Sequence, residues 1–549
     1  MTSSRGSWAV GPPGGGQEAA TALATGGAAR AEAVSATGLA AAEAPPAAAP
    51  AAELRSYDAG PVWARWLAPA VALLISLLHI ETPSYWRDEA ATIAAVRRPL
   101  GDLVKMLAHV DAVHGAYYLM IWPIEHLFGS GALVMRLPSA VAAAVAAAAI
   151  AAIGRRLISP WAGLAAGLFL AILPVTSRYG EEARSYQLVV AAATIATYLL
   201  VRVLAAEPAA RSRWIAGYAA SMAALGVLNI FGLLMIPAHA VAVALACRRD
   251  LRDPATRRLV VGWLAAVAAG VLVSSPLLVL GWQQRGQIAW LSVNTSSSGL
   301  STLYSLSGSF LVTTAALAVI AVALVLSTEL GRQRRTAMWP SRLWEISLPW
   351  LVVPPLLLLI ASHVQPVYTS RYILICVPAL ALLGGAAVAS YGRFVGAIGL
   401  AVVLIAGATT QIGQRTLAGH YDDILALDQI VAANARQGDY VLYTNPNALS
   451  FGAAYPFGLD KLPNIALRQG PIPSATLGGT IAPLAQIRSR LAHAKRVWVV
   501  EINSLVTDPE LLGLNGLPVS QTPIMDDTRL AFRAYWHERG DYLILFTRS

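Results

Sequence analysis

The chain has 549 residues, of which 56% are hydrophobic and only 13% are charged, whereas a soluble globular chain carries roughly 25% charged residues. So few charges exclude an ordinary soluble protein. The net charge of +10 does not indicate nucleic-acid binding, because the basic residues gather at the ends of apolar runs, where they orient membrane helices. Cys247 and Cys376 both lie in apolar stretches, which argues against a disulfide framework or a thiolate metal site.

The N-terminal segment, residues 1–60, consists largely of Ala, Gly, Pro and Ser with few aromatic residues. Such a composition buries too little apolar area to offset the entropy of ordering, so we predict a disordered cytoplasmic tail. The first long apolar run begins near Val62. This position is too far from the start for a secretory signal peptide, and we interpret the run as a retained membrane span.

Apolar segments recur along the chain from residue 61 to residue 411 and predict about eleven transmembrane helices, since a span needs roughly 20 residues. The loops that are rich in arginine all fall on one side under this count, and that side is the cytoplasm. The loop 81–131 is then outside. The segments are 62–80, 132–153, 161–177, 186–204, 214–229, 231–247, 259–281, 303–327, 344–362, 372–391 and 394–411.

The remainder, residues 412–549, has the pattern of a soluble α/β domain. YDDILALDQIVAANA predicts an amphipathic helix, and DYVLYT, RVWVVEI and DYLILFTR predict strands. An odd number of spans places this domain outside the plasma membrane. The predicted fold is therefore an all-α polytopic membrane bundle over residues 61–411 with an extracytoplasmic α/β domain after it.

The loop that follows the first span begins YWRDEAATIAAVRR and contains adjacent acids, Asp88 and Glu89. Asp88 is a candidate general base, because deprotonating an acceptor hydroxyl needs a carboxylate within hydrogen-bond reach. The alternative is a helix N-terminus, where acidic residues interact favourably with the helix dipole.

The same loop continues HVDAVHGAYYLMIWPIEHLFG, which places His109, Asp111 and His114 just before an aromatic helix that contains Tyr117. Imidazole and carboxylate groups suit a divalent cation or a phosphate-orienting role. The spacing fits no standard zinc pattern, so a hydrogen-bonded loop near the membrane is the alternative.

Further polar residues fall in later outer loops. The turn TSRYGEEARSYQL contains Glu182, Arg184 and Tyr186 at the junction of two spans, and ionisable groups this close to hydrocarbon usually face a cavity. An ion pair that locks the two spans together is the alternative. Arg285 and Arg371 are suited to bidentate contact with a lipid-linked phosphate. For Arg285, contact with lipid head groups is the alternative.

Four of these features together resemble the GT-C glycosyltransferases, in particular the protein O-mannosyltransferase and lipid A aminoarabinose transferase branch. They are RDE after the first span, YYLMIWPIEHLFG followed by MRLPSA, the EEARSY turn, and RY at the start of a late span. The resemblance covers roughly residues 62–410. It implies an inverting enzyme that moves a sugar from a polyprenyl-phosphate carrier to an extracytoplasmic glycan, lipoglycan or protein.

The resemblance also implies roles for individual residues. It transfers the catalytic acid to Asp88, with Glu89 beside it, and matches Asp111 only loosely. It makes Arg184 and Arg371 donor-phosphate or loop-ordering residues. Mannose is the expected sugar, with arabinose or another pentose as the alternative.

Some members of the family use a divalent cation, but no ligand set is assigned here. A nucleotide-sugar donor is not expected, because the chain lacks a GxxxxGK phosphate loop. A polytopic transporter or flippase of a lipid-linked sugar is the alternative function. Transporters tend to place polar residues at the bilayer midplane, whereas the charges here gather at one face.

Overall fold

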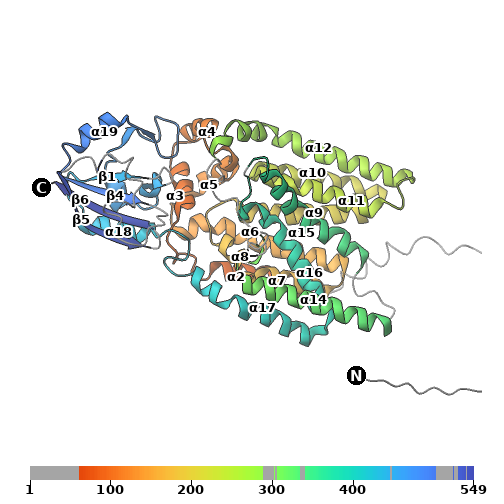
Figure 1. Ribbon diagram of the computed structural model, residues 1–549. Coiled ribbons are helices and arrows are strands. Elements are labelled where there is room, and N and C mark those ends of the chain that lie inside the picture. The colour runs from red at the N-terminus through yellow and green to blue at the C-terminus, as the bar shows by residue number, and fades with distance from the viewer. Residues whose placement is uncertain are drawn as a thin grey trace, which may run out of the picture. The chain divides into compact units, whose positions relative to one another are not determined.

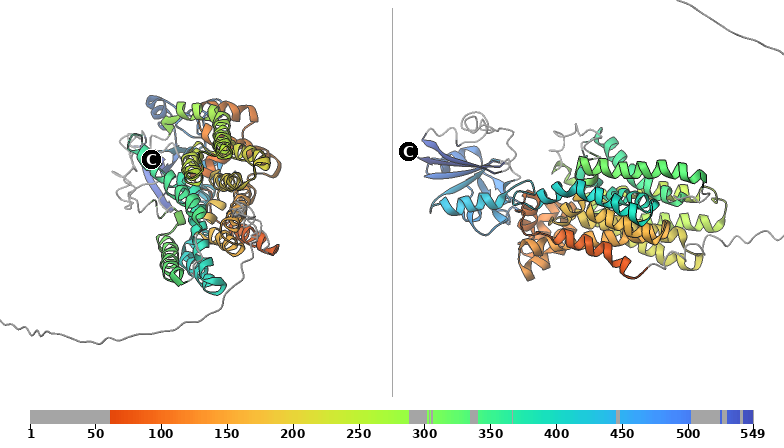
Figure 2. Two further views of the ribbon diagram at one scale, coloured as in Figure 1. Left: turned by 90° about the vertical axis from the view of Figure 1, so that its right-hand side faces the viewer. Right: turned by 90° about the horizontal axis from the view of Figure 1, so that it is seen from below.

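The structure is a computed structural model that describes residues 61–287, 302, 304, 306–333, 340–365, 367–444, 448–501, 524, 529–538 and 541–548. The predicted tail, residues 1–60, lies outside these described residues. Figures 1 and 2 show a helical bundle that carries a small sheet domain at one end. Between them lie the helices α3 (Arg87–Val96), α4 (Leu100–His109) and α5 (Gly115–Phe128).

Each predicted apolar segment corresponds to helical structure in the bundle. Side-chain caps mark the start of two of these helices. Ser159 accepts a hydrogen bond from the amide of Ala162 at the start of α7, and Asp253 accepts one from the amide of Thr256 at the start of α12. The helices are α2 (Trp63–Leu77), α6 (Ala132–Leu157), α7 (Pro160–Ile172), α8 (Pro174–Gly180), α9 (Tyr186–Ala205), α10 (Pro208–Leu228), η2 (Ile230–Leu234), α11 (Met235–Cys247), α12 (Pro254–Gln283), α14 (Phe310–Gln333), α15 (Ser341–Ser362), η4 (Ser370–Cys376), α16 (Val377–Ser390) and α17 (Gly392–Gln414).

Among the described helices, seven are long and apolar enough to cross a membrane, and the bent pair α7–α8 is an eighth if it counts as one span. Helices α2, α10 and α14 are not among these seven. The protein is therefore a multi-pass membrane protein, while the number of eleven spans stays a prediction.

The bend between α7 and α8 is 64° and occurs at Leu173, directly before Pro174. Proline has no amide hydrogen and its ring clashes with the preceding turn, which favours a kink or a break in the helix at the residue before it. The short helix α8 then leads the chain into the EEARSY turn. In this way one proline directs Arg178, Glu182 and Arg184 toward the outer loop.

Small residues allow the helices at the centre of the bundle to approach closely. A Cβ atom on Gly385 of α16 would lie 2.3 Å from the amide nitrogen of Ala166 in α7. One on Gly163 of α7 would lie 2.4 Å from the carbonyl oxygen of Ala151 in α6. Helices α6, α7 and α16 therefore form the tightly packed centre against which the more exposed helices lie.

The outer loop 81–131 is mostly helical. Its elements are α3 (Arg87–Val96), α4 (Leu100–His109), η1 (Ala112–His114) and α5 (Gly115–Phe128). Buried apolar side chains of α3 and α5, including Ile93 and Tyr117, belong to the same hydrophobic core as Leu427 of α18 and Trp498 of the sheet. The outer loop and the C-terminal domain therefore share one core.

The C-terminal domain is a mixed four-stranded sheet in the order β1-β4-β6-β5, with β1 and β4 parallel and the other pairs antiparallel. Helix α18 packs on one face and α19 on the other. The expected helix and three strands are present as α18, β1, β4 and β6, whereas β5, α19 and the two-stranded sheet β2-β3 were not predicted. The bounds are α18 (Ile424–Asn434), β1 (Tyr440–Tyr443), η6 (Phe451–Ala453), η7 (Gly458–Lys461), β2 (Leu467–Gln469), β3 (Thr480–Ile481), α19 (Leu484–Leu491), β4 (Arg496–Glu501), β5 (Leu530–Glu538) and β6 (Asp541–Arg548).

The close packing at Gly385 generates a stability prediction. Gly385→Ala places a methyl group against the backbone of α7, and overpacking of this kind costs about 1 to 3 kcal/mol. Thermal unfolding of the purified protein in detergent measures the effect. Gly399→Ala on α17 is the matched control, because its Cβ would lie 3.6 Å from Val388, an ordinary contact. Equal thermal stability of the two variants would contradict the packing assigned to Gly385.

Candidate active site

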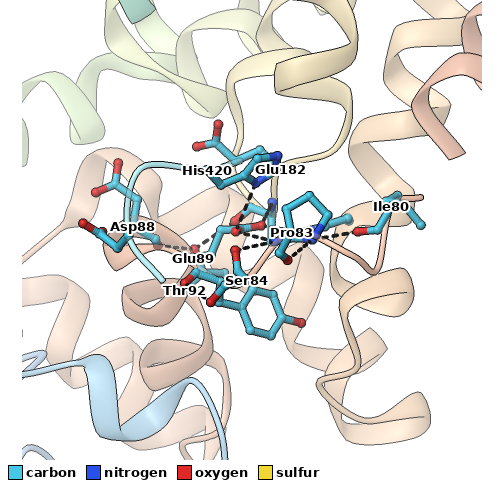
Figure 3. Close-up of polar contacts among 12 residues, drawn as sticks. Ile80, Pro83, Ser84, Asp88, Glu89, Thr92, Glu182 and His420 are labelled. Carbon is cyan, nitrogen blue, oxygen red and sulfur yellow. Dashed lines mark hydrogen bonds and ion pairs between the residues drawn. The ribbon is translucent and has the colours of Figure 1, made fainter. Parts of the chain in front are cut away.

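Glu89 lies among the turn residues Pro83 and Ser84 (Figure 3). It forms a fully buried ion pair with Arg136 of α6. Arg136 donates from Nε to Glu89 Oε1 at 2.8 Å and from Nη2 to Oε2 at 2.7 Å. The amide of Ala183 in the EEARSY turn also donates to Oε1, at 2.8 Å. Burial alone would raise the pKa of the Glu89 carboxyl, but Arg136 outweighs burial and holds that pKa below its usual range.

The rest of the Arg136 guanidinium contacts backbone carbonyl groups of the turn between α2 and α3. It donates to the carbonyl oxygens of Ile80 at 2.7 Å, Pro83 at 2.9 Å and Ser84 at 3.3 Å. The ion pair therefore holds together the end of the first helix, the outer loop and the EEARSY turn.

Asp88 lies to one side of this cluster (Figure 3) and its side chain is 20% exposed. Arg371 of η4 donates from Nη1 to Asp88 Oδ2, and Nη2 of Arg184 lies 3.8 Å from the same oxygen. Burial opposes ionisation of this carboxyl, but the two guanidinium groups outweigh burial and lower the pKa of Asp88. Asp88 is thus an ionised carboxylate that faces two cations.

Arg184 is itself held by the outer loop. It donates from Nη1 to the hydroxyl of Tyr118 at 2.9 Å, and its Nη2 lies 3.0 Å from His114 Nε2. Tyr118 in turn donates to the carboxylate of Asp111. Burial, with the charge of Arg184, lowers the pKa of His114 to about 4, so His114 is neutral near pH 7 and can accept a hydrogen bond from Arg184.

The ring of Trp86 lies close to two guanidinium groups. Cζ of Arg371 is 4.8 Å from the ring centroid and Cζ of Arg178 is 5.7 Å from it. Arg178 also pairs with Glu182 at 3.0 Å, and the hydroxyl of Tyr186 lies 3.4 Å from Arg371 Nη1. Aromatic faces thus orient the arginines of α8 and η4 near the loop 81–131.

A cavity of about 360 Å³ lies beside these arginines. Ser370, directly before Arg371, and Arg178 both line it, and Nη2 of Arg178 is buried without a hydrogen-bond partner. The cavity therefore offers an unsatisfied cationic donor next to the Asp88 site. The lining residues are Val175, Arg178, Tyr179, Tyr304, Gly308, Ser370, Leu374, Thr410, Gly413, Gln414, Gly419 and Tyr421.

Three of the residues singled out from the sequence lie apart from this cluster. Arg285 is exposed, donates to the carbonyl of Trp282 at 3.1 Å and lies over its ring. His109 is exposed and bonds to the carbonyl of Lys105. Tyr117 is fully buried beside Tyr118, with 6.4 Å between the ring centroids. The structure therefore brings together Asp88, Asp111, His114, Glu182, Arg184, Tyr186 and Arg371, with Glu89 directly behind them.

Several residues of this cluster were not singled out from the sequence. Trp86 and Tyr118 lay within quoted motifs but resembled core aromatics. Arg136 lay in MRLPSA, and a charged residue near the start of an apolar helix was the available signal.

The part of the chain that the structure describes holds no group of three or more His, Cys, Asp and Glu side chains suited to bind a metal ion. The acids and histidine of the loop are instead engaged with Tyr118 and Arg184.

The comparisons with known proteins agree with this fold. Residues 114–282 match the model of a family described as dolichyl-phosphate-mannose-protein mannosyltransferase. The structure is similar to ArnT from Cupriavidus metallidurans in the apo state, with a TM-score of 0.57 and 14% identity over 87% of this chain and 97% of that one. ArnT bound to undecaprenyl phosphate gives a TM-score of 0.55 and 13% identity at the same coverage. No curated protein sequence matches the chain significantly. The resemblance to GT-C glycosyltransferases is confirmed in the fold.

The buried ion pair leads to a prediction about folding. Glu89→Gln leaves the Arg136 guanidinium buried without its counter-charge, and loss of one partner of a buried pair costs about 3 to 5 kcal/mol. A large fall in thermal stability is therefore expected for the full chain in detergent. Asp102→Asn is the matched control, since Asp102 pairs with the exposed Lys105 and exposed pairs contribute little. Similar melting temperatures for the two variants would show that the Glu89 pair is not a structural requirement.

Proposed function

We propose that this protein of GT-C fold is an inverting glycosyltransferase that moves a sugar from a polyprenyl-phosphate carrier to an extracytoplasmic acceptor. The sugar that we propose is mannose. The observation that carries the proposal is the Asp88 carboxylate, partly exposed and facing Arg371 and Arg184. A base and two phosphate-binding cations are the groups that this transfer needs. The N-terminus is then cytoplasmic, and the site and the C-terminal domain are extracytoplasmic.

The reaction is a single displacement at the anomeric carbon. The acceptor hydroxyl oxygen forms a bond to that carbon, its proton passes to Asp88, and the bond from the carbon to the phosphate oxygen breaks. The electron pair stays on the polyprenyl phosphate, whose added negative charge Arg371 and Arg184 stabilise. One displacement inverts the configuration of the sugar.

The ion pair of Asp88 with Arg371 and Arg184 has a role in this scheme. Arg371 and Arg184 lower the pKa of Asp88, and a carboxylate in that state is a poor base. An incoming phosphate competes for the same guanidinium groups. As they turn toward the phosphate, Asp88 loses its counter-charges, and its pKa rises toward the value that proton abstraction requires. Donor binding thus activates the base.

The remaining polar residues position these groups. Neutral His114 and Tyr118 accept hydrogen bonds from Arg184 and fix its direction. Asp111 orients Tyr118. The cavity beside Arg178 and Ser370 provides room for the phosphate end of the donor. Support comes from the similar fold of ArnT, which has been solved with undecaprenyl phosphate.

The choice of sugar rests on the family model, whose description names mannose. A pentose such as arabinose serves the same chemistry and is the second donor to test. The acceptor is a glycan, a lipoglycan or a protein. Glu89 is a structural support of Asp88 in this proposal, because its carboxylate oxygens are occupied by Arg136 and Ala183.

Asp88→Asn is expected to lower sugar transfer by a factor of about 10² to 10⁴, the usual contribution of a general base. The measurement is transfer in purified membranes with labelled polyprenyl-phosphate-mannose, and in parallel polyprenyl-phosphate-arabinose, at matched expression. Asp102→Asn controls for loss of a carboxylate elsewhere in the outer loop. Transfer that survives in Asp88→Asn would refute the assignment of the base. Movement of intact lipid-linked sugar across proteoliposomes, without transfer to acceptor, would favour a flippase.

The activation of Asp88 by donor binding predicts a difference between two pH profiles. kcat/KM reports the free enzyme, in which the pKa of Asp88 is lowered, so it should stay flat as pH falls through the usual range of an aspartate. kcat reports the donor complex and should fall at a higher pH, because there the arginines contact the phosphate. If kcat and kcat/KM fell at the same acidic pH, or if kcat/KM fell at the higher pH, this mechanism would be contradicted.

A further inference from the structure

Helix α3, which carries Asp88, begins without a cap from its own neighbourhood. The N-cap residue is Trp86, whose side chain makes no capping hydrogen bond. The first amides of a helix have no partner within the helix, so buried ones need an acceptor from elsewhere. For Arg87, that acceptor is Oδ2 of Asp422, which lies 2.8 Å from its amide nitrogen and 335 residues away in the sequence.

Asp422 binds the side chain of Arg87 as well. Nε of Arg87 donates to Oδ2 at 2.9 Å and Nη2 donates to Oδ1 at 2.5 Å. The Asp422 side chain is 1% exposed, so water cannot replace either contact without rearrangement. One buried carboxylate thus holds both the backbone and the side chain at the first residue of α3, where the helix dipole also favours a negative charge.

The residues on either side of Asp422 contact the same part of the site. His420 is fully buried, with Nδ1 3.8 Å from Oε2 of Glu89. The ring of Tyr421 lies 5.1 Å from that of Trp86. Residues 420–422, which we term the return segment, therefore contact Trp86, Arg87 and Glu89 around the catalytic carboxylate. The segment connects α17 to α18, so it ties the last membrane helix and the C-terminal domain to α3.

We propose that Asp422 is a positioning residue that caps helix α3 from a distant part of the same chain. It thereby sets the direction of Asp88 relative to Arg371 and Arg184. The structural part stands on the contacts alone, and the effect on catalysis rests on the proposed function. Without the cap, the first turn of α3 frays and Asp88 samples directions away from the two arginines. A misplacement of about 1 Å in a catalytic group lowers the rate roughly a hundredfold.

The test compares Asp422→Ala with Asp423→Ala in the full-length protein in detergent. Asp423 is a matched control, because it is the next residue, is also buried and also caps a helix, accepting from the amide of Ala426 at the start of α18. Hydrogen–deuterium exchange of the amides of α3 and α18 is read by mass spectrometry. We expect Asp422→Ala to raise exchange in the first turn of α3 about tenfold, and Asp423→Ala to raise it only in α18.

Kinetics with labelled polyprenyl-phosphate-mannose give the second readout. Asp422→Ala should lower kcat about a hundredfold with the donor KM nearly unchanged, since the donor contacts remain. Asp422→Asn should restore most of kcat, because asparagine caps helices as well as aspartate does. Asp423→Ala should keep the wild-type kcat. Unchanged α3 exchange in Asp422→Ala, or an equal loss of kcat in Asp423→Ala, would overturn the proposal.

Two further variants decide the case if Asp422→Ala does not fold. Asp422→Asn and Arg87→Gln both weaken the ion pair but keep the hydrogen bond to the Arg87 amide. Protection of α3 in both supports the cap, and its loss in both would show that the charge pair alone orders the helix. If the wild type transfers no sugar, the proposed function fails, while hydrogen exchange still decides whether Asp422 orders α3.

Discussion

The buried ion pair between Glu89 and Arg136 is the interaction on which the candidate site depends. Both side chains are fully inaccessible, so their desolvation has to be offset by near-complete hydrogen bonding. The carbonyl groups of Ile80, Pro83 and Ser84 and the amide of Ala183 provide it. These groups come from the turn between α2 and α3 and from the EEARSY turn before α9. The hydrogen bonds of the pair are therefore complete only when both turns are in place.

Adjacent acids acquire different chemistry from this arrangement. Successive helical residues point about 100° apart, so when Glu89 is fixed on Arg136 the neighbouring Asp88 must face another direction. That direction contains Arg371 and Arg184 and keeps a fifth of the Asp88 side chain exposed. One helix turn therefore presents two different acids. Both carboxylate oxygens of Glu89 are engaged in hydrogen bonds, whereas the carboxylate of Asp88 is available for proton transfer. The sequence already singled out Asp88 as the candidate base, whereas the structural role of Glu89 depends on Arg136, which lies 47 residues further along the chain.

The parts of the structure that the sequence predicted are those with a local signal. Apolar segments near the length of a membrane span located the helices of the bundle, and shorter apolar runs located β4 and β6. Strand β5 was not predicted from the sequence. It is an exposed edge strand with a bulge after Phe532, so its apolar and polar residues do not alternate regularly. The cap by Asp422 has no local signal at all, since donor and acceptor are 335 residues apart. Arg285 carried the right charge on the predicted side, yet its side chain lies over Trp282.

The ring of Trp86 connects the two halves of the outer site. Arg371, which pairs with Asp88, and Arg178, which lines the cavity and pairs with Glu182, both contact it. Tyr421 of the return segment lies against the same ring. Under the proposed function, an arginine that moves toward a donor phosphate changes its contact with this ring, which the return segment also contacts. The two arginines and the segment that leads to the C-terminal domain therefore meet at one aromatic side chain, which is a physical reason for the domain to remain joined to the site.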